Sequence, residues 1–241
     1  WLVIATGDNE TSEVRLVPAA NPTGAHVLVK ARRKGVEYDV DVRDGTLWVH
    51  TNDDHVNFRL ATAPLATPGE WTTLLAGSDE FYLTGFELYR DFYVTEGRLA
   101  GLDQVQLRQY GSDTVTPIAF PEASYDTGLS NNPEYAVDKL RLAYQSMVTP
   151  SSVYDYHVAD GRLELLKQQE IPSGYDPALY KTERLMIAAR DGTQVPVSVV
   201  MRKDRPAGGP LHLYAYGAYG YAIPPGFSAS RLSLLDRGMA Y

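Results

Sequence analysis

The chain has 241 residues, of which 44% are hydrophobic and 22% are charged, a globular composition that excludes a disordered or collagen-like protein. Its 22 Lys and Arg against 30 Asp and Glu give a formal net charge of −8, which argues against a nucleic-acid partner. The absence of Cys excludes disulfides and thiolate chemistry, and no apolar run is long enough to predict a membrane span.

Both ends of the sequence have the character of a strand interior. Trp1 begins an apolar run, and Tyr241 ends another that follows a helix stop. Natural domains rarely begin or end inside a strand, because the cut strand leaves backbone groups unpaired. We therefore expect an internal piece of a longer protein, which leaves the location open between the cytoplasm and the periplasm.

The first 170 residues contain four segments with one plan: an apolar strand, a polar turn, and a strand of alternating character. These segments are 1–16, 47–60, 92–107 and 140–156. A third strand is predicted after each of them, at 26–29, 71–75, 115–118 and 163–166. A leading strand is predicted before the last three, at 38–42, 83–88 and 127–130.

Four short strands in a unit of about 45 residues are typical of a β-propeller blade. The alternation within strands follows from the pleat, which turns every second side chain into the packing between blades. We predict three complete blades and one that lacks its first strand. The alternative is an antiparallel β-sandwich, but the fourfold recurrence of one strand order favours the propeller.

Few side chains within the repeat suggest chemistry. Asp39 and Asp41 lie two apart in a strand and share a face, so they could hold a cation or act as an acid/base pair, although a solvated or channel-facing strand is favoured. No histidine of the repeat has a second ligand at a recurring spacing, and each is expected on the surface or in a turn; these are His26, His50, His55 and His157. We predict no metal site and no cofactor.

The pattern changes near residue 175. Strands at 183–189 and 195–202 are joined by an Asp-Gly turn, which predicts a hairpin. A buried strand is expected at 211–216, then a glycine-aromatic loop, and then a helix capped by Ser228 or Ser230 that ends at Gly238 before a new strand. This order is how an α/β sheet begins. The predicted domains are therefore 1–174 and 175–241.

Short strings throughout the chain carry a family resemblance. They occur in order at 12–15, 37–41, 85–88, 167–170, 189–192, 195–198, 214–220, 227–232 and 235–238. Together with a blade repeat that passes into an α/β segment, they resemble the prolyl oligopeptidase family, and within it the oligopeptidase B branch. The resemblance covers nearly all of the sequence.

The resemblance implies a two-part serine peptidase. In the family, an α/β-hydrolase domain carries a Ser-Asp-His triad, and a seven-bladed propeller covers the active site so that only short peptides enter. This chain would hold the last three to four blades and the first strands and helix of the hydrolase domain. The substrates would be short peptides cleaved after Lys or Arg. The triad would lie beyond Tyr241, so the chain alone would be inactive and would need the remainder of its polypeptide as a partner.

The resemblance also implies two site residues. Tyr216 matches the tyrosine that supplies a hydroxyl to the oxyanion hole, and Tyr219 matches an aromatic position of the substrate pocket. In oligopeptidase B an acidic pair often precedes the Phe-Ser-x-Ser-Arg string and favours a second basic residue in the substrate. Pro224 and Gly226 stand there in this sequence, so a preference for paired basic residues is not carried over.

The sequence itself offers no nucleophile. The string from Gly226 to Ser230 approaches Gly-x-Ser-x-Gly, but a Pro-Pro pair precedes it and its last Gly is replaced, so a helix N-cap is favoured. His212 is not placed as a base by any motif. Two other functions stay open: a propeller binding module with a structural α/β tail, and an esterase or lipase of the hydrolase fold.

Overall fold

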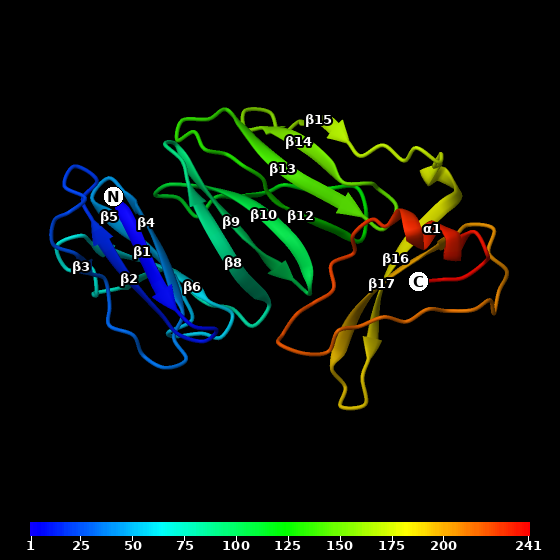
Figure 1. The fold of residues 1–241 in the computed structure, drawn as a ribbon, viewed down its shortest axis with the longest axis horizontal. Coiled ribbons are helices and arrows are strands. Elements are labelled where there is room, and N and C mark those ends of the chain that lie inside the picture. The colour runs from blue at the N-terminus through cyan, green and yellow to red at the C-terminus, as the bar shows by residue number, and fades with distance from the viewer. The chain divides into compact units, whose positions relative to one another are not determined.

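The structure, a computed structural model, describes residues 1–241. It is built mainly of strands, with one α-helix and one short 3-10 helix (Figure 1). Two compact units are present: residues 1–99 with 108–112 form the first, and residues 100–107 with 113–241 form the second. No helix has the length and the hydropathy needed to cross a membrane.

Four antiparallel meanders account for the repeat. The first sheet has three strands and the next three sheets have four each, in the orders β1-β2-β3, β4-β5-β6-β7, β11-β10-β9-β8 and β12-β13-β14-β15. The strands are β1 (Leu2–Gly7), β2 (Ser12–Val17), β3 (Val27–Leu28), β4 (Tyr38–Arg43), β5 (Thr46–Thr51), β6 (Arg59–Pro64), β7 (Thr72–Leu75), β8 (Phe81–Leu88), β9 (Phe92–Leu99), β10 (Leu102–Gln109), β11 (Val115–Pro117), β12 (Tyr125–Leu129), β13 (Lys139–Ser146), β14 (Ser152–His157) and β15 (Leu163–Gln168). The prediction of one incomplete and three complete four-stranded units is confirmed.

The alternation of side chains places the second sheet between two cores. Leu47 and Val49 of β5 pack in one buried cluster with Val14 of β2. Trp48, which lies between them in the sequence, belongs to another cluster with Leu83 of β8. Successive residues of a strand point to opposite faces, so this sheet buries both faces, as a blade between two neighbours must.

The residues after β15 form a different structure. A 3-10 turn, η1 (Pro177–Leu179), leads into a hairpin of β16 (Tyr180–Ala188) and β17 (Gln194–Arg202), and the helix α1 (Ala229–Leu235) follows a long loop. The hairpin and helix are confirmed as predicted. The hydroxyl of Ser228, the N-cap residue, makes no capping hydrogen bond. Gly238, with a φ of 83°, adopts the left-handed conformation that favours glycine where the chain leaves the helix.

The end of the chain joins the hairpin. Val200 of β17 and Tyr241 exchange two backbone hydrogen bonds of 2.8 and 3.0 Å, and Ala240 forms a parallel bridge with Leu211. Beneath them, α1 buries its apolar face in a cluster with β17 and with the turn between β13 and β14. The buried members of this cluster are Met147, Tyr180, Val200 and Leu235.

The expected buried strand at 211–216 is wrong. Only Leu211 makes a strand-like bridge, and the side chains of Leu213 and Tyr214 are 76% and 54% exposed. A central strand of a parallel sheet needs hydrogen-bonding neighbours along its whole length. Within this chain, the backbone pairing of this segment ends at His212, whose N–H donates to Ala240, so the apolar run beyond it has no sheet to enter.

Candidate functional site

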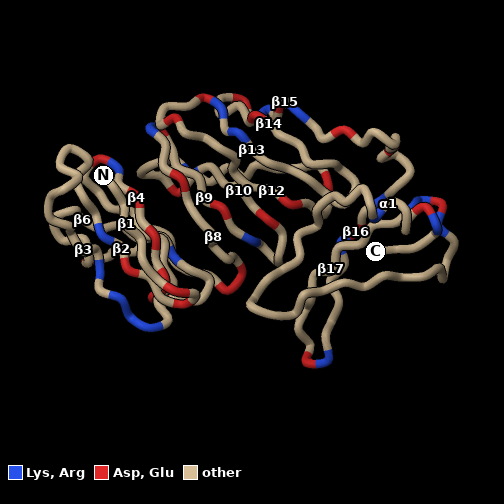
Figure 2. Tube along the Cα trace, viewed as in Figure 1, with Lys and Arg blue, Asp and Glu red and all other residues tan.

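The loop between β17 and α1 contains the predicted site residues. From Pro206 to Ser230 it has no Asp, Glu, Lys or Arg, and Figure 2 shows this stretch without charge colours. It does have apolar side chains that are more than a third exposed: Leu211, Leu213, Tyr214, Tyr216, Tyr219, Tyr221 and Ile223. Large apolar side chains left exposed in such number usually mark an interaction site.

A glycine-rich turn shapes the middle of this loop. Gly217 and Gly220 have φ values of 78° and 63°, and the backbone N–H of Tyr221 donates to the carbonyl of Ala218 over 3.1 Å. Tyr219 also has a positive φ, 55°, which is unusual for a residue with a side chain. The turn presents its ring to solvent, where it is 94% exposed.

Tyr216 lies just before the turn. Its ring packs edge to face on Tyr221, with centroids 5.6 Å apart, and about half of its surface is exposed. The phenol is therefore positioned by an aromatic contact while its surface is open to an incoming group. The oxyanion role of Tyr216 and the pocket role of Tyr219 both stay predictions.

The ends of the loop are fixed by packing and hydrogen bonds. At the far end the ring of Phe227 meets Tyr175 edge to face at 5.2 Å, and its backbone N–H donates to Oε1 of Gln145 over 3.2 Å. Arg231 donates to the carbonyl of Gly226 over 2.9 Å, and burial lowers the pKa of the Arg231 guanidinium. Gln145 is not recognisable as a site residue from the sequence, because a glutamine in a strand has no distinguishing pattern.

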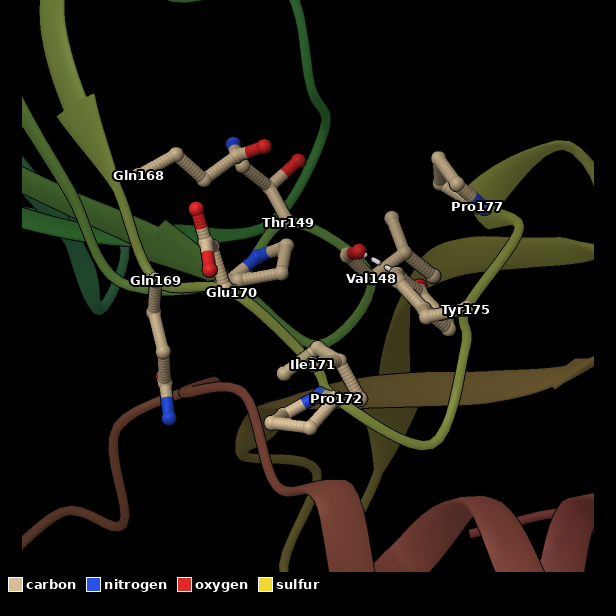
Figure 3. Close-up of a pocket in the computed structure, with 10 residues that line it drawn as sticks. Val148, Thr149, Gln168, Gln169, Glu170, Ile171, Pro172, Tyr175 and Pro177 are labelled. Atoms are coloured by element: carbon tan, nitrogen blue, oxygen red, sulfur yellow. Dashed lines mark hydrogen bonds between the residues drawn. The ribbon is translucent and has the colours of Figure 1, made fainter.

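A pocket of about 480 Å³ lies where the last blade meets the tail (Figure 3). The turn after β13, the residues that follow β15 and the segment leading into η1 line it. Tyr175 forms one side, and its hydroxyl donates to the carbonyl of Val148 over 2.5 Å. Glu170 is the only ionisable carboxylate in the lining, and no His or Ser accompanies it. The pocket therefore has no Ser-His pair of the kind that serine hydrolysis needs.

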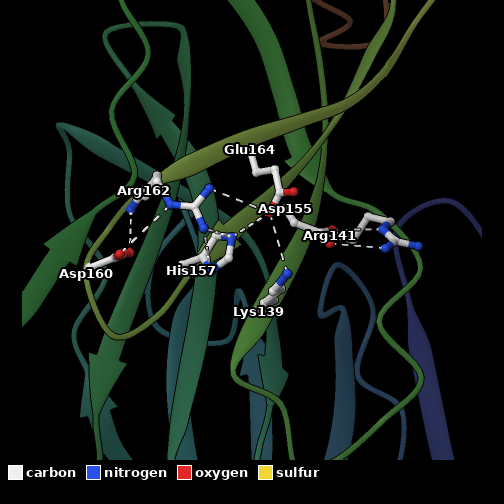
Figure 4. Close-up of polar contacts among 7 residues, drawn as sticks. All are labelled: Lys139, Arg141, Asp155, His157, Asp160, Arg162 and Glu164. Atoms are coloured by element: carbon white, nitrogen blue, oxygen red, sulfur yellow. Dashed lines mark hydrogen bonds and ion pairs between the residues drawn. The ribbon is translucent and has the colours of Figure 1, made fainter.

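A charged cluster on β13, β14 and β15 is shown in Figure 4. Nε2 of His157 lies 2.7 Å from Oε2 of Glu164, and Arg162 and Lys139 approach the same oxygen at 3.7 and 3.5 Å. The hydrogen bond with His157 is the main cause that lowers the pKa of Glu164, and the Lys139 charge adds to it. The cluster links neighbouring strands, and we assign it a structural role.

The expectation of a surface or turn position is wrong for His50. Its ring is 6% exposed on β5, and it stacks on Phe58 at 4.6 Å. Nε2 lies 3.0 Å from the carbonyl oxygen of Leu83, and Nδ1 lies 3.2 Å from Asp39. Both ring nitrogens have partners, which makes burial of this imidazole tolerable.

The carboxylates of Asp39 and Asp41 lie on the exposed side of β4, as the alternation predicted. Near them, Glu87 has a raised pKa, mainly from burial and further from the charge of Asp41. Nowhere does the structure bring together three His, Asp or Glu side chains in an arrangement that could hold a metal ion. Asp39 is instead engaged with His50.

Comparison with known proteins agrees with the blade architecture. Residues 1–169 match the sequence model of the prolyl oligopeptidase N-terminal β-propeller domain. Dipeptidyl aminopeptidase BI of Pseudoxanthomonas mexicana is 39% identical over the whole chain, which spans 34% of that protein. Protease 2 of Moraxella lacunata is 27% identical, again over the whole chain and 35% of the relative.

Solved structures give the same result. Oligopeptidase B from Trypanosoma brucei, in a closed form with covalently bound antipain, matches 99% of this chain and 36% of its own with a TM-score of 0.90 and 31% identity. Oligopeptidase B from Leishmania major matches with a TM-score of 0.87, also at 31% identity, over 99% of this chain and 35% of its own.

The repeat, the sheets and these similarities define the first 169 residues as blades of a peptidase-associated β-propeller. The chain belongs to the prolyl oligopeptidase family, as the sequence motifs predicted. It spans about a third of the length of the relatives it matches.

Proposed function

We propose that the protein to which this chain belongs is a serine oligopeptidase. It would hydrolyse short peptides, after Lys or Arg, through an acyl-enzyme formed by a serine outside these 241 residues. The observation that carries this proposal is the similarity to two oligopeptidase B structures, which runs over 99% of the chain and so includes the blades and the tail alike.

In this proposal, residues 1–174 are the later part of the propeller and 175–241 begin the α/β-hydrolase domain. The pairing of Tyr241 with Val200 and the parallel bridge between Leu211 and Ala240 support the start of a mixed sheet. The uncharged, exposed loop supports it too, because further strands and helices of a catalytic domain would cover such a surface. The propeller would select short peptides by limiting entry.

Tyr216 would donate its hydroxyl to the oxyanion of the tetrahedral intermediate. A neutral donor held near the reacting carbonyl stabilises charge that develops only in the transition state, so it raises kcat more than it tightens substrate binding. The open phenol edge and the aromatic support from Tyr221 are compatible with this role. Tyr219, exposed on the neighbouring turn, would line the substrate pocket.

The test is the hydrolysis of an N-terminally blocked chromogenic peptide ending in Arg by the full-length protein. We expect turnover by that protein and none by the 241-residue chain. Tyr216→Phe should lower kcat by about 10²–10³-fold with little change in KM. Tyr221→Phe, which keeps the supporting ring, is the matched control and should keep most of the activity. Full activity of Tyr216→Phe would remove the oxyanion role, and turnover by the isolated chain would overturn the placement of the nucleophile outside it.

A second candidate is the removal of dipeptides from a free amino terminus. It is favoured by the 39% identity to a protein named dipeptidyl aminopeptidase BI, which is higher than the identity to the oligopeptidase B structures. The two candidates differ in how they treat the amino end of the substrate. Cleavage of the blocked peptide supports the oligopeptidase, whereas cleavage only of unblocked peptides, two residues from the amino end, supports the dipeptidyl aminopeptidase.

A further inference from the structure

Strand register brings two polar side chains of the last blade together. Asp126 on β12 is directly opposite Gln145 on β13 in the antiparallel pair. Directly opposite residues share a face of the sheet and are close enough to interact. Here Nε2 of Gln145 donates to Oδ2 of Asp126 over 2.8 Å. This hydrogen bond fixes which end of the Gln145 amide carries the oxygen.

The oxygen end of the same amide faces the loop. Oε1 of Gln145 accepts the backbone N–H of Phe227 over 3.2 Å, although the two residues are 82 positions apart in the sequence. Asp126, Gln145 and the Phe227 N–H therefore form a hydrogen-bonded relay from blade to loop. The relay has a direction, because the carboxylate can only accept and the backbone N–H can only donate.

Gly226 fits closely against this amide. A Cβ added at Gly226 would lie 3.1 Å from Cδ and Nε2 of Gln145 and 3.2 Å from Oε1. Those distances are tighter than ordinary van der Waals contact, so a larger residue would displace the amide or the loop. The φ of Gly226 is not in the left-handed region. Space, rather than backbone conformation, therefore restricts position 226.

The relay holds the loop that carries Tyr216 and Tyr219 at its C-terminal end, next to α1. Phe227 has two contacts that hold it in place: its N–H donates to Gln145 of the last blade, and its ring packs on Tyr175 in the segment after that blade. The hydroxyl of Tyr175 in turn donates to the carbonyl of Val148. The other end of the loop is held at 210–212 by the C-terminal segment. Between these two attachments the chain from 213 to 223 is exposed and contains Tyr216 and Tyr219.

We propose that Gln145 is a positioning residue. Its amide is held by β12 and accepts the N–H of Phe227, and in this way it fixes where the loop that carries Tyr216 lies relative to the blade. Gln145 does not touch the reacting atoms and acts through the loop. The inference rests on the proposed function for its catalytic consequence. Through this link, the propeller sets the place of the oxyanion donor in addition to limiting the entry of substrate.

The first measurement is independent of catalysis. In the full-length protein, hydrogen exchange of the backbone at 226–228 is compared between the unaltered protein and Gln145→Ala. We expect faster exchange in the variant, by about three- to tenfold for the Phe227 N–H, which corresponds to the loss of one neutral hydrogen bond. Gln168→Ala is the matched control, since its amide also donates across the sheet, to Ser152, without touching the loop. Unchanged exchange in Gln145→Ala would overturn the proposal.

The second measurement is kinetic. We expect Gln145→Ala to lower kcat by about three- to tenfold with KM nearly unchanged, whereas Gln168→Ala should change neither. Faster exchange at 226–228 with an unaltered kcat would overturn the positioning role. Absence of peptidase activity in the unaltered protein would instead refute the proposed function, and hydrogen exchange would still decide whether the relay places the loop.

Exchanging the amide and the carboxylate between positions 126 and 145 distinguishes a positioning role of Gln145 from general support of the fold. Gln145→Glu puts a carboxylate against the Asp126 carboxylate, and two such groups cannot hydrogen-bond to each other when ionised, so we expect a lower kcat and faster exchange than in the unaltered protein. Asp126→Asn added to Gln145→Glu provides an amide donor at 126 and a carboxylate acceptor at 145, and both kcat and exchange should recover. A double variant no better than Gln145→Glu would overturn the relay.

The close fit of Gly226 against the Gln145 amide allows a final test of their contact. Gly226→Ala should lower kcat in the unaltered background, because the added methyl meets the Gln145 amide. The same change should add nothing in a Gln145→Ala background, where the amide is absent. Full additivity of the two substitutions would contradict a contact between them.

Discussion

The ion pair of Asp53 and Arg59 allows a quantitative test of how burial stabilises a blade. Nε and Nη2 of Arg59 donate to the two carboxylate oxygens of Asp53 over 2.8 and 3.1 Å, and Nη1 donates to Thr73 over 2.6 Å. The two charged side chains are only 8% and 14% exposed. The pair connects the turn after β5 to the start of β6, and Thr73 extends it to β7.

Asp53→Asn keeps the size of the side chain and removes its charge. The guanidinium then stays desolvated with a neutral partner that can present only one acceptor. Loss of one member of a buried ion pair costs about 3–5 kcal/mol. The retained acceptor favours the lower end, about 3 kcal/mol. A loss of about 3 kcal/mol in the free energy of unfolding lowers the melting midpoint of the cooperative unit that contains the pair.

Asp91→Asn is the matched control, because it makes the same chemical change in an exposed pair. Arg90 donates to both oxygens of Asp91 over 2.8–3.1 Å, but the side chains are 62% and 61% exposed. Exposed pairs contribute about 0–1 kcal/mol. Thermal unfolding of the full-length variants should therefore separate the two substitutions clearly. Equal shifts in the melting midpoint would refute the argument that burial decides the contribution.

Two further predictions concern other blades. The pKa of Glu164 is held below its usual value, first by the hydrogen bond with His157. The stability that Glu164 contributes is therefore present above the pKa of this group in the unfolded chain, about 4.5, and is lost as the pH falls through its pKa in the folded protein. Acid should lower the melting midpoint less in Glu164→Gln than in the unaltered protein, and parallel curves of melting midpoint against pH would contradict this. Gly97→Ala should destabilise the protein, because the added methyl would meet the ring of Phe81 and lie 2.6 Å from the carbonyl oxygen of Tyr82, whereas Gly85→Ala has open space and should be nearly neutral in the same unfolding assay.

The blades could be predicted because residues close together in the sequence determine their strands. Each strand alternates apolar and polar residues over a few positions, and each blade repeats the order of its neighbours, so the pattern of 47–60 was sufficient to place β5 and β6. The hairpin of β16 and β17 is equally local, since Asp191 and Gly192 specify its turn. The sequence strings were likewise sufficient for the family.

The errors arise where structure depends on distant partners. The apolar run at 211–216 has the composition of a buried strand, but a strand forms only where neighbours satisfy its backbone, and pairing stops near 212. The burial of His50 was missed because its partners lie outside its own strand: Phe58 precedes β6 and Leu83 is on β8. Gln145 was not noticed for the same reason: its contact with Phe227 joins segments far apart in the chain.

The structure of the full-length protein with a peptidyl-arginine aldehyde bound would test the central claim most directly. The claim is that the loop after β17 brings Tyr216 to the acyl oxygen of a peptide attacked by a serine of the same polypeptide. The account predicts that the aldehyde is bonded to that serine and that the Tyr216 hydroxyl lies about 2.7–3.1 Å from the resulting oxyanion. An adduct whose oxygen is bound by other donors, with the Tyr216 ring turned away, would contradict it.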